Sequence, residues 1–190
     1  LANYGGFHHP AIYLAEAQRL GISVRPPHVN HSRRHFTLAL VGEEGDAPLL
    51  WMGLSQVRSL RRRTIAAILT QRKVRPFASL ADLRSRVEVQ SKELTHLIQC
   101  GALDGLGESR AALLAAAQEK SNTVGAWQLT FVFDEPLLVP EDDAQRLQWE
   151  RQVLGQPVSV HPVAVMGAAR TGCRTLAQAA AQPGRKLRLA

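Results

Sequence analysis

The chain has 190 residues, 45% of them hydrophobic, which is enough to bury a core in one domain or two small ones and argues against long intrinsic disorder. Its 23 basic residues outnumber 16 acidic ones, and the resulting net charge of +7 favours anionic partners, nucleic acid first. No apolar run approaches the length of a membrane-spanning helix, and two cysteines are too few for a disulfide framework, so we expect a cytoplasmic protein with no membrane partner.

The first part of the chain predicts one helix and one β-hairpin. Apolar residues fall on one helical face from 10 to 20, with Pro10 in the first turn and Gly21 after the end. The apolar residues then recur with a period of two in residues 36–41 and 49–54, on either side of an acidic loop at 42–46. This alternation predicts a β-hairpin over residues 36–54.

From residue 55 to residue 120 the apolar spacing is helical. We expect short helices over residues 62–72, 79–87, 91–100 and 110–120, with Ser79 and Ser91 as N-caps. The stretch 51–77 also holds seven basic residues and no acid, so its charge equals the net charge of the whole chain, +7.

The last third is less regular. Residues 121–140 read as an irregular linker, and 141–182 as a helical link whose first helix, 141–154, has acids at its start and Gly155 after its end. Residues 183–190 alternate like the first strand of a sheet. Because that strand has no partner here and Leu1 is not a methionine, we expect a piece of a longer chain.

The segment 105–114 fits a helix-hairpin-helix pattern: glycine, apolar, glycine, three variable residues, a small residue and two apolar ones. Its glycines let the backbone turn tightly and present N–H groups at a helix N-terminus, where a phosphate oxygen is held without any base being read. A plain connection between two helices is the alternative interpretation. The candidate DNA-binding residues are Gly105, Leu106, Gly107, Glu108, Ser109 and Arg110.

An upstream segment, 59–69, has the same spacing of hairpin, apolar residue and following helix. Serine and arginine replace the two glycines, so we expect arginine side chains to contact phosphate instead. A solvated basic helix start is the alternative. The candidate DNA-binding residues here are Arg58, Ser59, Leu60, Arg61, Arg62 and Arg63.

The sequence contains no recognisable catalytic centre. Five histidines before residue 36 invite a zinc site, but no cysteine lies near them. Asp142 and Asp143 are acids in the first turn of a predicted helix, where acids are common. We therefore expect no metal ligands, no catalytic residues and no cofactor in this segment.

The motifs follow one another in a recognisable order, at residues 3–21, 26–32, 52–63, 76–83, 101–113, 150–162 and 183–189. They include Pro26-Pro27-His28-Val29-Asn30 and the glycine hairpin at 105–107. In this order they resemble the C-family DNA polymerases, which are the bacterial DNA polymerase III α subunits and their error-prone homologues.

The resemblance implies a mainly α fold: a tandem helix-hairpin-helix domain, a small β-hairpin before it and a truncated OB-fold start after it. The implied division is 1–35, end of the fingers region; 36–54, β-hairpin connector; 55–120, tandem helix-hairpin-helix domain; 121–140, linker; 141–182, helical link; and 183–190, first strand of the OB domain.

The resemblance also implies a function. The segment would grip the backbone of double-stranded primer–template DNA during template-directed synthesis, next to the remainder of the α subunit. The catalytic aspartates and Mg²⁺ of this nucleotidyltransferase family lie in the palm, upstream of this segment, so the segment alone would be inactive. The alternative is a stand-alone, non-enzymatic DNA-binding module or a degenerate remnant of such a polymerase.

Overall fold

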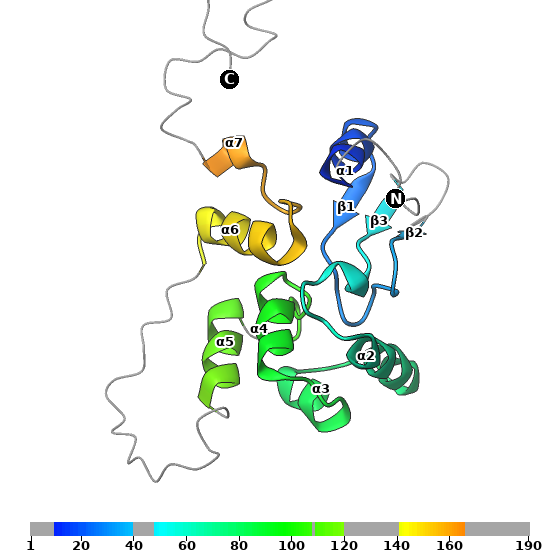
Figure 1. Ribbon diagram of the computed structural model, residues 1–190, viewed down its shortest axis with the longest axis vertical. Helices are drawn as coiled ribbons and strands as arrows, with labels where there is room; N and C mark the ends of the chain where they lie inside the picture. Colours follow the sequence, from blue (N-terminus) through cyan, green and yellow to red (C-terminus); the bar gives the residue numbers. More distant parts are fainter. Residues whose placement is uncertain (1–9, 40–47, 108, 120–140, 166–190) are drawn as a thin grey trace, which may run out of the picture.

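The computed structural model describes residues 10–39, 48–107, 109–119 and 141–165 (Figure 1). The predicted linker at 121–140 and the predicted strand at 183–190, with its truncated OB domain, lie outside these ranges. The helices are α1 (Pro10–Arg19), α2 (Arg62–Val74), α3 (Leu80–Arg86), α4 (Ser91–Gln99), α5 (Arg110–Glu119), α6 (Asp143–Leu154) and α7 (Pro162–Val165), with a 3-10 turn η1 (Leu54–Gln56) before α2. The fold is mainly α, as predicted.

A small three-stranded sheet stands beside the helices. Strand β2 (Thr37–Ala39) pairs antiparallel with β3 (Leu49–Trp51), which confirms the predicted hairpin with strands of only three residues each. A third strand, β1 (Ser23–Arg25), pairs parallel with the other edge of β3. The sequence did not predict β1, because three residues between a glycine and two prolines are too few to show a period of two.

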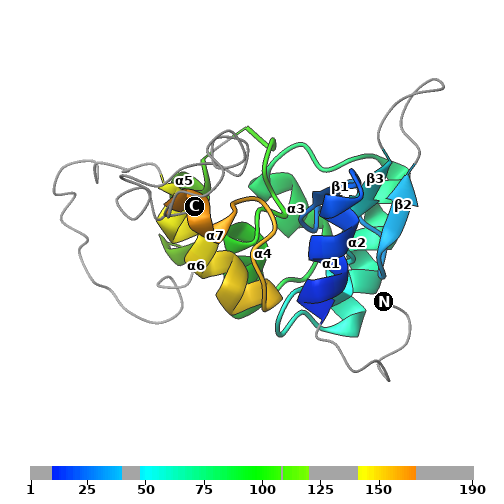
Figure 2. The same cartoon turned by 90° about the horizontal axis from the view of Figure 1, so that it is seen from above.

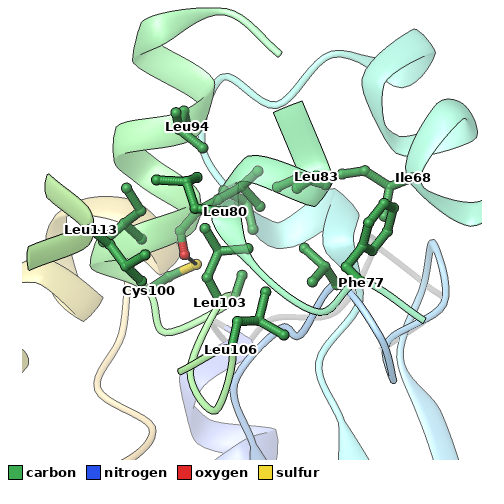
Figure 3. Packing of buried hydrophobic residues seen from close by; sticks show 14 of the residues in the cluster. Ile68, Phe77, Leu80, Leu83, Leu94, Cys100, Leu103, Leu106 and Leu113 are labelled. Carbon is green, nitrogen blue, oxygen red and sulfur yellow. Dashed lines mark hydrogen bonds between the residues drawn. The ribbon is translucent and has the colours of Figure 1, made fainter. Parts of the chain in front are cut away.

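Two apolar clusters fix these elements. A small cluster of Leu14, Met52 and Val158 joins α1, the end of β3 and the segment after α6. The larger cluster runs through the helices, where α4 contacts both α5 and α6 (Figure 3). Its members include Ile65, Ile68, Phe77, Leu80, Leu83, Leu94, Leu97, Ile98, Leu103, Leu106 and Leu113. Burying each leucine, isoleucine or phenylalanine side chain is worth about 1.5–3 kcal/mol.

Figures 1 and 2 agree on how these parts are arranged: α1 and the sheet lie on one side, α5 and α6 on the other, with α4 between them. Helix α4 therefore lies between the two sides of the molecule. The predicted helix periodicity is confirmed in α2, where Ile65 and Ile68 are buried.

The helix ends follow the prediction in three of four cases, the first being Gly21, which follows α1 with a φ of 82°. The Ser79 side chain accepts a hydrogen bond from the Asp82 N–H at 3.1 Å, and Gly155 ends α6 with a φ of 78°. The prediction that Ser91 caps α4 is wrong. Ser91 is the first helical residue, and the N–H of Gln90 before it donates to the Glu93 carboxylate at 3.0 Å.

The loop after β1 is fastened to the helices by polar contacts. The Val29 N–H donates to the Ala102 carbonyl at 3.0 Å, and the Asn30 amide exchanges two hydrogen bonds with the backbone of Phe77, at 2.8 and 2.9 Å. The Arg72 guanidinium donates to the carbonyl of Val29 at 3.0 Å. The loop and the helical core therefore form one packed unit.

Candidate nucleic-acid interface

The first predicted hairpin is a tight turn over residues 57–60. The Leu60 N–H donates to the Val57 carbonyl at 3.2 Å, which closes the turn. Ser59 has a φ of 63° and is the one non-glycine with positive φ among the described residues. Ser59 therefore takes the left-handed backbone conformation that glycine supplies in the motif.

The second hairpin has the same local geometry. The Leu106 N–H donates to the Leu103 carbonyl at 3.2 Å, and Gly105, in the place equivalent to Ser59, has a φ of 80°. Leu106 is buried, while Gly105 and Gly107 are exposed. The chain therefore makes two similar turns from two different local sequences.

The helices after the two turns begin at different places. Helix α2 starts at Arg62, three residues after the serine of its turn, whereas α5 starts at Arg110, five residues after Gly105. Both starts agree with the helices predicted over 62–72 and 110–120, but the two segments do not share the same distance from the turn to the following helix. The reason lies in the caps: the Ser109 hydroxyl accepts from the Ala112 N–H at 3.2 Å, whereas a carboxylate from another helix accepts the Arg61 N–H at 2.8 Å.

That carboxylate is Glu93 of α4, which is 1% exposed. The Arg61 guanidinium donates to both of its oxygens, at 2.9 and 2.7 Å, and the Thr64 hydroxyl donates at 2.9 Å. Burial raises the pKa of Glu93, but the hydrogen bonds from Arg61, Gln90 and Thr64 outweigh it and hold the pKa at about 2. The Arg61 side chain is thus used inside the fold.

The backbone of Arg58 joins the first turn to α6 and, a second time, to α4. The Arg58 N–H donates to the Val153 carbonyl of α6 at 3.0 Å, and its carbonyl accepts from Nδ1 of His96 on α4 at 2.6 Å. The Arg58 side chain is exposed, and Leu60 is partly buried against the core. The turn is therefore held on the side that faces α4 and α6, while Arg58 and Ser59 are exposed to solvent.

Arg62 and Arg63 point into solvent at the start of α2. In the part of the chain that the structure describes, neither guanidinium forms an ion pair. They differ in this from their neighbour Arg61, although the three residues are consecutive.

Arg110 belongs to the interior of the second hairpin. It is 4% exposed and donates to both carboxylate oxygens of Asp104, at 2.8 and 2.5 Å, while Glu141 lies 3.6 Å away. Burial lowers the pKa of Arg110, but these carboxylates outweigh it and raise the pKa overall. The guanidinium braces the turn from within. The predicted residue Glu108 lies outside the described residues.

Comparisons with known proteins agree with this geometry. A family model described as a helix-hairpin-helix motif matches residues 21–113. The DNA polymerase III subunit alpha of Thermus aquaticus is 37% identical over 169 residues, 80% of this chain and 13% of that protein. The same subunit of Halalkalibacterium halodurans is 36% identical over 79% of this chain and 14% of its own length.

An error-prone DNA polymerase of Methylococcus capsulatus is 30% identical over 85% of this chain and 17% of its own length. The chain is homologous to a segment of the bacterial DNA polymerase III α subunits and error-prone DNA polymerases. It spans 13% to 17% of the length of these three relatives. The resemblance inferred from the motif order is confirmed.

The residues that hold the two turns in place were not predicted from the sequence. Glu93 and His96 of α4 fix the first turn, and Asp104 fixes the second. Glu93 occupies the first turn of its helix, where an acid is common, and that ordinary position gave no sign of a partner on α2. The one available signal was the amphipathic spacing of α4, which places Glu93 and Leu97 on one face.

Two other properties concern only the described ranges. There, no group of three His, Cys, Asp or Glu side chains is placed to hold a metal ion. No described helix is both long enough and apolar enough to cross a membrane.

Substituting Ser59 by glycine should stabilise the protein by up to about 1 kcal/mol. Relief of the left-handed strain, about 1–2 kcal/mol, outweighs the extra backbone entropy of glycine in the unfolded chain. The urea midpoint should rise. Ser85→Gly, at an exposed site inside α3, is the matched control and should lower the midpoint, because glycine in a helix costs about 0.5–1 kcal/mol. A lower midpoint for Ser59→Gly would contradict the strained turn.

Proposed function

We propose that this chain binds the backbone of double-stranded DNA through its two turns, independently of base sequence, as the DNA-holding part of a polymerase. The observation that carries the proposal is the pair of turns with left-handed residues, Ser59 and Gly105, both anchored to α4 and both exposed at their tips. Because both turns are bonded to α4, their positions relative to each other are fixed, and a duplex would contact both at once.

The second turn supports contact through backbone groups. A Cβ at Gly105 or Gly107 would meet nothing within 4 Å, so the space above both residues is open to a ligand. The following helix α5 begins at Arg110, and the first N–H groups of any helix have no partner inside it. The Ser109 hydroxyl accepts one of them, the Ala112 N–H, and a phosphate oxygen at this helix start would accept from the remaining ones and complement the positive end of the helix dipole.

The first turn favours contact through side chains. Arg62 and Arg63 are exposed at the start of α2, and Arg58 is exposed on the turn itself. Guanidinium groups bind phosphate oxygens in charge-assisted pairs and carry no sequence information when they do so. Of the arginines predicted to touch DNA, Arg61 and Arg110 instead have their guanidinium groups engaged by carboxylates of the chain.

The names of the relatives support a more specific proposal for which DNA and which protein the chain contacts. We propose that the duplex is the primer–template of a DNA-directed DNA polymerase, and that the remainder of the α subunit is the second partner. Nucleotide addition would then take place elsewhere in the parent nucleotidyltransferase, with its Mg²⁺, and this segment would hold DNA without a cofactor. The cytoplasmic location expected from the cysteine content stays a prediction.

Removing Arg62 and Arg63 together should weaken duplex binding and reduce its salt dependence. Each phosphate contact contributes about 0.9 to the slope of log affinity against log salt, so the double Arg62→Ala, Arg63→Ala variant should lose about one to two units of slope. Fluorescence anisotropy with a labelled blunt duplex across a salt series measures this. Preference among base sequences should not change, because phosphate contacts do not read bases.

The matched control is Arg19→Ala, which removes an exposed guanidinium from α1, away from both turns (Figure 1). Its slope should equal that of the wild-type chain. The proposal is refuted when the unmodified chain shows no salt-dependent duplex affinity, or when the double variant keeps the wild-type slope while circular dichroism shows it folded.

A further inference from the structure

A cluster of three aromatic rings lies beside the second turn and plays no part in the grip described above. His31 stacks on Trp51 of β3, with ring centroids 4.9 Å apart and an interplanar angle of 20°. His28 lies against His31 at 4.6 Å. His31 is exposed and Trp51 is partly buried. The outer member of the cluster therefore faces solvent while the inner members support it.

His28 fixes the cluster to the second turn. Its Nδ1 accepts the Asn30 N–H at 3.1 Å, which assigns the ring proton to Nε2. Nε2 then donates to the carbonyl of Asp104, a residue of the second turn, at 2.8 Å. Burial lowers the pKa of His28, so the ring is neutral at pH 7 and keeps this donor. The ring cluster and the turn are thus one rigid surface.

Basic residues outnumber acidic ones around the cluster. Residues 20–42 hold three arginines and no acid, and the Asp104 carboxylate beside His28 is paired with Arg110. Arg25 of β1 stands directly opposite Trp51 of β3 in the strand register. Side chains of directly opposed residues lie on the same face of a sheet, so Arg25 shares the face that carries Trp51. Arg25 is exposed, and so are Arg33 and Arg34, which follow His31 in the chain.

An exposed aromatic ring on a basic surface has the chemistry that binds an unpaired base. Stacking on an aromatic side chain requires a free base face, which a base inside a duplex does not offer. Arginine beside the ring supplies a partner for the phosphate that precedes or follows that base. Both features are present here, next to a turn that is itself proposed to hold duplex.

We propose that His31, supported by Trp51, stacks on an unpaired base of a DNA strand that continues beyond the duplex, with Arg25 as a phosphate partner. The proposal rests on the proposed duplex grip and adds a second substrate element to it, the single strand. A duplex end held at the second turn would deliver its overhanging strand to the ring cluster, because Asp104 links the two.

The test uses the full chain and three labelled probes: a blunt duplex, the same duplex with a short single-stranded overhang, and the overhang strand alone. Fluorescence anisotropy should give about tenfold tighter binding to the overhang duplex than to the blunt one. His31→Ala should abolish that preference, and His31→Phe should keep it, since phenylalanine retains a ring without a charge. His35→Ala, at an exposed histidine four residues on, is the matched control and should behave as wild type.

The outcomes separate this proposal from the duplex grip. Equal wild-type affinity for the blunt and overhang duplexes would overturn the ring site and leave the grip standing, whereas absence of binding to both would overturn the grip. A folded His31→Ala chain that keeps the preference also overturns the ring site. Should that variant lose its circular dichroism signal, His31→Gln, which has a polar side chain and no ring, replaces it with the same expected loss.

Discussion

Replacing Arg61 by alanine should lower the free energy of unfolding by about 3 kcal/mol at neutral pH. The substitution leaves the Glu93 carboxylate, 1% exposed, without its guanidinium partner, and an uncompensated buried charge costs about 3–5 kcal/mol. The lower end applies because the Thr64 hydroxyl and the Gln90 N–H still donate to that carboxylate. Urea denaturation followed by circular dichroism measures the change.

The neighbouring substitution Arg62→Ala is the control, and it should change stability by no more than about 0.5 kcal/mol, because that side chain is exposed. The difference between the two variants should also depend on pH. The folded-state pKa of Glu93, about 2, lies below its ordinary value of 4.5, so its contribution is present above pH 4.5 and is lost as the pH falls toward 2. Equal stability of the two variants at pH 7 would contradict the buried pair.

This pair also affects how duplex binding is tested. A variant lacking Arg61, Arg62 and Arg63 together would lose affinity both because two exposed guanidinium groups are gone and because the first turn loses the guanidinium bonds that join it to Glu93 of α4. The double variant that keeps Arg61 removes only the exposed charges. The two variants together therefore separate the proposed binding role of Arg62 and Arg63 from the folding role of Arg61.

The local parts of the fold followed from the sequence because their causes are local. Ile65 and Ile68 are one helical turn apart and are both buried. Ser79 caps α3 through Asp82, three residues on, and Gly155 ends α6 in the left-handed conformation. Each of these signals acts within four residues, which is the range over which propensity, capping and periodicity operate.

The parts that could not be predicted depend on distant partners. Arg61 and Glu93 are 32 residues apart, and Arg58 and His96 are 38 apart. Nothing in the run of three arginines distinguishes the one that meets Glu93, because that choice is made by how α4 packs beside the start of α2. Sequence patterning thus located both hairpins but assigned Arg61 and Arg110 to the DNA surface, where the packing gives each a carboxylate of the chain itself.

Substituting Gly101 by alanine should be more harmful than the same change at Gly105. Both residues have positive φ, 79° and 80°, so each substitution costs about 1–2 kcal/mol of backbone strain. At Gly105 a Cβ meets nothing within 4 Å. At Gly101 it would overlap Nη2 of Arg110 and lie 2.8 Å from Oδ2 of Asp104, so the ends of these two side chains would have to shift and their ion pair would be disturbed.

We expect Gly105→Ala to lose about 1–2 kcal/mol of stability and Gly101→Ala to lose more than that, in urea titrations under the same conditions. Duplex affinity adds a second readout. Gly101 is buried and touches no proposed ligand, so weaker binding by a folded Gly101→Ala chain reports distortion of the second turn through Arg110 and Asp104. If the two variants were equally stable, the Arg110–Asp104 pair would not be what holds the second turn, and its rigidity would have to come from the burial of Leu106 and from the hydrogen bond between His28 and the Asp104 carbonyl.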